Sequence, residues 1–77
     1  MVVYHVTTLR KLQKYIASGC IKAPVRAWEN IKQAERMSKS TGRKIILRLK
    51  FPEDAEKYEG HFNQARVIYN DYIMKDF

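Results

Sequence analysis

Residues 43–51 read Arg-Lys-Ile-Ile-Leu-Arg-Leu-Lys-Phe, and this stretch decides the fold class of the 77-residue chain. From Ile45 onward every second side chain is apolar, while Lys44, Arg48 and Lys50 share the opposite face. A period of two residues is typical of a half-buried strand. The stretch therefore predicts a strand whose outer face is basic.

Working outward from this strand, the rest of the chain predicts short alternating strands and helices. Thr7 and Thr8 are N-cap candidates for the first helix, and Gly19 and Gly42 stand where left-handed residues would end two helices. In chain order the predicted elements are a strand at 2–6, a helix at 9–18, a short edge strand at 20–22, a helix at 27–39, a strand at 43–51, a helical turn between 52 and 60, and a last strand at 65–69.

This order predicts one small α+β domain spanning residues 1–77. We expect a mixed sheet of three or four strands with two helices packed on one face. The other face of the sheet would then carry His5, Lys44, Arg48, Lys50 and Arg66. The apolar tail at 72–74 is expected to dock on the core.

The bulk composition excludes several classes of protein. A single cysteine, Cys20, cannot form an internal disulfide, and two histidines are too few for a structural zinc site. The longest apolar run has four residues, far short of the ~20 needed to cross a bilayer. No signal peptide is recognised. We therefore expect a soluble cytoplasmic protein with no membrane association, no metal and no cofactor.

The charge of the chain is unevenly distributed. Residues 1–50 have a formal charge of +10 and residues 51–77 a charge of −3, which gives +7 overall. Clustered cations bind phosphate backbones by releasing counterions, so this asymmetry favours nucleic acid or another anionic ligand as the partner. A solvated basic surface that keeps the protein soluble is the ordinary alternative.

The sequence His5-Val6-Thr7 is the most distinctive short motif. His5 and Thr7 have the same parity in the predicted strand, so both side chains lie on one face and are placed to bind one ligand. The ordinary alternative is that Thr7 caps the following helix and His5 is a half-exposed strand residue.

His5-Val6-Thr7, the apolar stripe of the following helix and the stretch from Gly19 to Pro24 together resemble the opening of ADP-ribosyltransferase-like domains. The resemblance covers about the first third of the chain. It implies that His5 and Thr7 contact the ribose and nicotinamide parts of NAD. The chain departs from the family in having no late-strand glutamate, since its acidic residues at 53, 56 and 59 fall in a predicted turn. A minimal or degenerate member without transferase activity is therefore expected.

Two other places carry candidate binding residues. Arg26 precedes the predicted second helix, where it would hold an anion together with free backbone N–H groups. His61 and Asn63 stand in a polar segment before the last strand, within reach of a ligand on the sheet. The alternatives are a solvated Arg26 and a purely structural turn around Gly60.

Three functional hypotheses follow. The first is a non-enzymatic binding module for an anionic ligand such as nucleic acid. The second is a minimal ADP-ribosyltransferase-like domain that binds a nucleotide such as NAD or ADP-ribose at His5 and Thr7. The third is a protein-interaction domain whose acidic segment, residues 53–59, meets a basic partner or a second copy in a homodimer.

Overall fold

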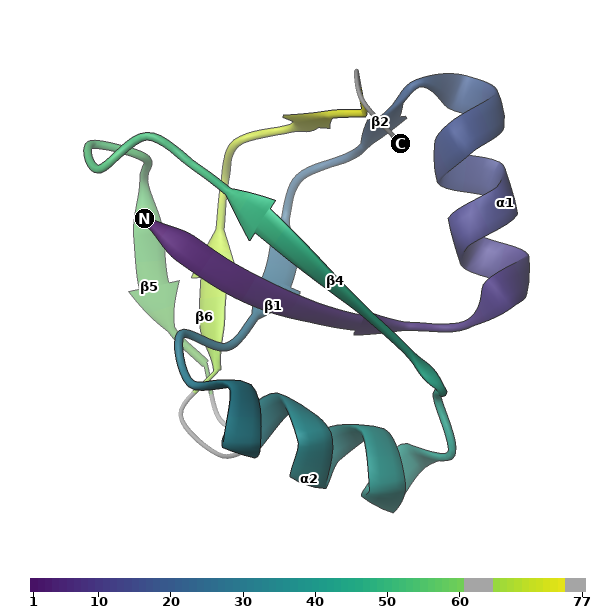
Figure 1. The fold of residues 1–77 in the computed structure, drawn as a ribbon. Helices are drawn as coiled ribbons and strands as arrows, with labels where there is room; N and C mark the ends of the chain where they lie inside the picture. Colours follow the sequence, from purple (N-terminus) through teal and green to yellow (C-terminus); the bar gives the residue numbers. More distant parts are fainter. Residues whose placement is uncertain (61–64, 75–77) are drawn as a thin grey trace.

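The computed structural model describes residues 1–60 and 65–74 as a small α+β domain with two helices and several antiparallel pairs of strands (Figure 1). This confirms the predicted fold class. The elements are β1 (Val2–Thr7), α1 (Leu9–Ser18), β2 (Cys20–Ile21), β3 (Val25–Ala27), α2 (Ile31–Thr41), β4 (Ile45–Lys50), β5 (Lys57–Glu59), β6 (Arg66–Ile68) and β7 (Tyr72–Ile73).

The antiparallel pair of β1 and β4 forms the centre of the molecule. Val3 lies opposite Leu49, and both side chains are fully buried. Along β4 burial alternates as the sequence predicts, with Leu47 and Leu49 buried and Arg48 and Lys50 exposed. The half-buried strand with a basic outer face is therefore confirmed.

The two helices pack against two different core clusters, which corrects the expectation that both pack on one face of one sheet. Leu12 and Tyr15 of α1 pack against the core that contains Val3 and Leu49. Ala34 of α2 packs against Val6, whose side chain has the opposite parity to that of Val3. Because β1 has buried apolar side chains on both faces, different parts of the chain pack against each face.

The segments that contain β2 and β3 pair with those that contain β7 and β6 in one antiparallel register. Cys20 lies opposite Ile73 and Ala27 opposite Arg66, so the register is the same before and after an interruption of three residues on each side. At the interruption the Ala23 backbone N–H donates to Asp71 Oδ1 at 2.7 Å. All pairings among the described residues are antiparallel, so the expected mixed sheet is replaced by three small antiparallel ones.

The second helix begins four residues later than predicted. Residues 25–27 form β3 instead, and the backbone of Trp28 exchanges two hydrogen bonds with that of Tyr4, at 2.7 and 2.9 Å. Asn30 provides the N-cap, since its side chain accepts from the backbone N–H of Lys32 at 2.8 Å. The apolar residues at 27 and 28 thus belong to sheet pairing and not to the helical stripe.

The predicted helical turn after residue 51 is also corrected. The chain makes one tight turn, in which the Ala55 N–H donates to the Pro52 carbonyl at 3.1 Å, and then enters β5. This strand pairs with β6, with Tyr58 opposite Val67. Proline and three acidic residues favour a helix start locally, but pairing with a strand later in the chain prevails.

The signals at the helix ends are confirmed. The Thr8 side chain accepts from the Lys11 N–H at 3.2 Å and caps α1. Gly19 and Gly42 end the two helices in the left-handed conformation, with φ of 79° and 72°. These ends fix where α1 stands, and one wall of the candidate site is built from this helix.

Candidate functional site

His5 is held through both of its ring nitrogens. Nδ1 lies 2.7 Å from the backbone carbonyl oxygen of Arg26, and Nε2 lies 3.1 Å from the hydroxyl of Tyr15. A carbonyl only accepts hydrogen bonds, so Nδ1 carries the proton and the neutral ring accepts from Tyr15 at Nε2. The histidine therefore ties together β1, β3 and α1.

The environment of His5 favours this neutral form. Burial lowers the pKa of His5 below its ordinary value of 6.5, and the positive charges of Lys11 and Arg43 lower the pKa further. The hydrogen bond with the Arg26 carbonyl opposes them, because it favours the protonated ring. The net result is an uncharged imidazole in a positively charged setting.

A cleft of about 440 Å³ opens beside His5, between α1 and the strands. Its lining includes the partly buried rings of His5 and Tyr15, which give it aromatic surface, and the almost fully buried Trp28. Its cationic lining residues are Lys11, Lys14, Lys22, Arg26 and Arg43. Clefts of 300–1,000 Å³ are the usual size for small-molecule sites.

The cleft is strongly electropositive. Among the described residues that line it there is no carboxylate. Lys22 is partly neutralised from outside the cleft, since its Nζ lies 3.6 Å from Asp71 Oδ2 in an exposed ion pair. The other four cations face the same space from α1, β3 and the segment before β4.

A smaller pocket of about 190 Å³ adjoins the cleft. The cleft and the smaller pocket share the lining residues Arg26, Arg43, Trp28 and Val6. Both arginines therefore lie at the junction of the cleft and the pocket. Met37 adds apolar surface to the smaller pocket. A ligand with an anionic group at the two arginines could therefore extend from an aromatic compartment into an apolar one.

The structure brings together only some of the predicted site residues. His5 and Arg26 meet in the cleft, although Arg26 reaches it from β3 and not from a helix start. Thr7 shares a face with His5 but is only 1% exposed, and it is absent from the described cleft lining. Its hydroxyl has no hydrogen-bond partner among the described residues.

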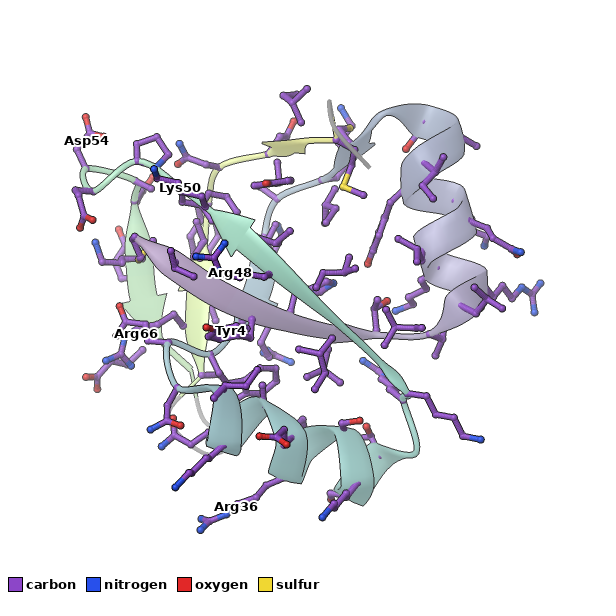
Figure 2. The ribbon with its side chains drawn as sticks, in the orientation of Figure 1. Tyr4, Arg36, Arg48, Lys50, Asp54 and Arg66 are labelled. Carbon is purple, nitrogen blue, oxygen red and sulfur yellow. The ribbon has the colours of Figure 1, made fainter. Side chains whose placement is uncertain are left out.

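The predicted basic strand face is separate from the cleft. Arg48 lies opposite Tyr4, and these residues have the opposite parity to His5 and Leu47 (Figure 2). The expectation that His5 shares a face with Arg48 and Lys50 is therefore wrong. Lys44 is exposed just before β4. His61 and Asn63 lie outside the described residues.

Sequence reasoning missed three contributors to the cleft. The sequence patterns single out none of Lys11, Tyr15 and Arg43 as binding residues, and Tyr15 also packs against the core. Lys11 and Tyr15 are four residues apart and so lie on one side of a helix, together with Ser18. That spacing was the available signal, but it does not say which side of α1 faces β1.

The described residues contain no group of three or more His, Cys, Asp or Glu side chains placed to hold a metal ion. In the same residues, none of the helices has both the length and the apolar character needed to cross a membrane.

No protein-family model, curated protein or solved structure matches the chain. The resemblance of His5-Val6-Thr7 to ADP-ribosyltransferase-like domains accordingly stays a prediction.

Proposed function

We propose that the chain binds a nucleotide, free or at the end of a nucleic-acid strand, in the cleft between α1 and the strands β1 and β3. One observation carries the proposal: cations from three parts of the chain face one cleft that contains aromatic side chains and, among its described lining, no carboxylate. Phosphate oxygens would pair with Arg26 and Arg43, because charge-assisted hydrogen bonds to guanidinium groups are the strong ones.

The aromatic lining supports a ligand that carries a planar base. His5 and Tyr15 line the cleft and are only partly buried, so part of their ring surface remains accessible to a base. Stacking of a base on an aromatic side chain is worth about 1–3 kcal/mol and tolerates every base. A simple inorganic anion would use the cations but leave this surface uncovered.

Binding fits the described residues better than catalysis. The cleft lining offers His5 as its general acid or base, but both ring nitrogens already have partners. A catalytic carboxylate of the kind that the resemblance implies for a transferase is absent from the described lining. The resemblance supports NAD and ADP-ribose as ligands to test beside AMP and a short oligonucleotide.

Titration of the chain with AMP, ADP-ribose, NAD and a short oligonucleotide, followed by NMR amide shifts, tests the proposal. Binding in the cleft should move the amides of His5, Tyr15 and Arg26. The variant K11Q/R43Q should bind at least about tenfold more weakly, because the lost contact of Arg43 alone is worth about 1.5–3 kcal/mol.

The matched control is R48Q/K50Q, which removes two positive charges from the opposite face and should leave the affinity almost unchanged. Equal weakening by both variants would point to general electrostatic attraction instead of a cleft. Shifts confined to β4 would move the site to the basic strand face. The proposal fails if none of the four ligands shifts the cleft amides at millimolar concentration.

A further inference from the structure

The outer side of α1 is apolar and uncovered. No residue of this helix is buried, and Leu9 and Ile16 are 59% and 52% exposed. They are seven residues apart, two helical turns, so they lie on one line along the helix. Lys11 and Ser18, which line the cleft, lie on nearly the opposite side. Ligand binding in the cleft therefore leaves Leu9 and Ile16 uncovered.

A second exposed apolar surface lies on the pair of β5 and β6. The rings of Tyr58 and Tyr69 pack edge to face with centroids 5.5 Å apart, yet these residues are 56% and 49% exposed. The Tyr58 hydroxyl donates to Glu56 Oε1 at 2.8 Å. The two tyrosines thus present ordered aromatic surface with a carboxylate at its rim.

The two surfaces carry opposite charge. We call Leu9, Arg10 and Ile16 the helix surface, and Glu56, Tyr58 and Tyr69 the hairpin surface. Arg10 is the cation of the helix surface, because Lys11 and Lys14 line the cleft on the other side of α1, and Glu56 is the carboxylate of the hairpin surface. Apolar contact and electrostatic attraction would therefore act together if the helix surface met the hairpin surface.

One molecule cannot join its own two surfaces. The ribbon places α1 and β5 at opposite ends of the molecule (Figure 1). We propose that the helix surface of one copy docks on the hairpin surface of a second copy, in a head-to-tail contact. Such a contact is heterologous, so it leaves one surface of each kind free and extends into a chain of molecules.

Charge also argues against the symmetric alternatives. A two-fold contact between two helix surfaces would bring the two copies of Arg10 together, and one between two hairpin surfaces would bring the two copies of Glu56 together. Like-charge contacts of this kind are costly. The head-to-tail arrangement pairs each charged rim with its opposite.

Analytical ultracentrifugation of the whole chain tests the contact. At low salt the average mass should rise with concentration above the 9.1 kDa monomer, and high salt should reverse the rise because it screens the charged rims. A monomer at every concentration up to the millimolar range, at low salt, would overturn the proposal.

Two blocked variants make the test specific. L9E/I16E removes the helix surface and Y58T/Y69T removes the hairpin surface, and all four positions are exposed. Each variant alone should sediment as a monomer. An equimolar mixture should form a 1:1 dimer and nothing larger, because only one intact surface of each kind remains.

The matched control is I31E, an exposed isoleucine on α2 outside both surfaces. It should associate like the unmodified chain, and circular dichroism should show that all variants are folded. If either blocked variant still dimerises alone, the contact is symmetric and the proposal is wrong. A mixture that stays monomeric refutes it as well.

Discussion

His5 is a polar side chain whose role depends on where its proton sits. Its neutral tautomer satisfies the Arg26 carbonyl and the Tyr15 hydroxyl at the same time. Protonation would add a positive charge between Lys11 and Arg43, both of which already lower its pKa. The histidine thereby couples the folded state to pH.

We predict that stability falls with acidification in the range where His5 titrates. The folded-state pKa is below 6.5, so at lower pH the unfolded chain takes up the proton more readily than the folded chain. The free energy of unfolding is therefore highest above about pH 6.5 and decreases toward the folded-state pKa. Urea denaturation at a series of pH values between 8 and 5 measures this decrease in the free energy of unfolding.

The control is His5→Gln, which should lack this decrease. Glu53 also has a lowered pKa, but its ordinary value is 4.5, so its loss of stabilisation lies at more acidic pH. An identical pH profile for the His5→Gln variant and the unmodified chain would contradict the prediction.

Thr7 makes a second prediction at the scale of the residue. Its hydroxyl is buried without a partner among the described residues, which costs about 1–3 kcal/mol. Thr7→Val keeps the branched shape and removes the hydroxyl, so it should raise the free energy of unfolding by about 1 kcal/mol. Thr7→Ser, which keeps the hydroxyl and loses the methyl group, should lower it. A destabilised valine variant in urea denaturation would show that the hydroxyl has a partner.

At the scale of elements, α1 is held by its two ends and by the partly buried side chains of Leu12 and Tyr15. None of its residues is buried, and helices of ten residues are marginal without packing. Thr8 caps one end, and at the other the Gly19 N–H donates to the Tyr15 carbonyl at 2.8 Å. The position of the Tyr15 hydroxyl against His5 depends on these ends.

We predict that Gly19→Ala lowers the free energy of unfolding by about 1 kcal/mol. Its φ of +79° disfavours any side chain, while nothing lies within 4 Å of the added Cβ, so the substitution tests the backbone alone. Gly19→Asn should cost less, because asparagine tolerates the left-handed region. Thermal unfolding of the unmodified chain, Gly19→Ala and Gly19→Asn gives the order of their stabilities. An alanine variant as stable as the unmodified chain would contradict the prediction.

The same elements show what the sequence predicts and what it does not. α1 and the core of β4 follow from local signals: a cap, a glycine stop and an alternation. The start of α2 does not, because Ala27 fits a helical stripe equally well but pairs with Arg66, 39 residues away in the sequence. His5 was found from its motif, whereas its partner Tyr15 depends on how α1 packs.

At the scale of the whole molecule, the charge asymmetry of the sequence takes a spatial form. Cations from distant parts of the chain converge on the cleft, while Arg48 and Lys50, which are labelled in Figure 2, lie outside its described lining. Net charge predicts an anionic partner but not which of these faces receives it. The two basic surfaces can be distinguished only in the folded structure, and not from the positions of the cations in the sequence.

The interrupted ribbon of residues 20–27 and 66–73 has a consequence for how this chain could vary. Three residues separate the two ladders on each strand, and the register is preserved only because these spacers are equal in length. Deleting one residue from either spacer would shift one ladder against the other and turn alternate side chains out of the core. Loss or gain of one residue in both spacers together would keep the pairing. Length variation in this ribbon should therefore occur in matched pairs.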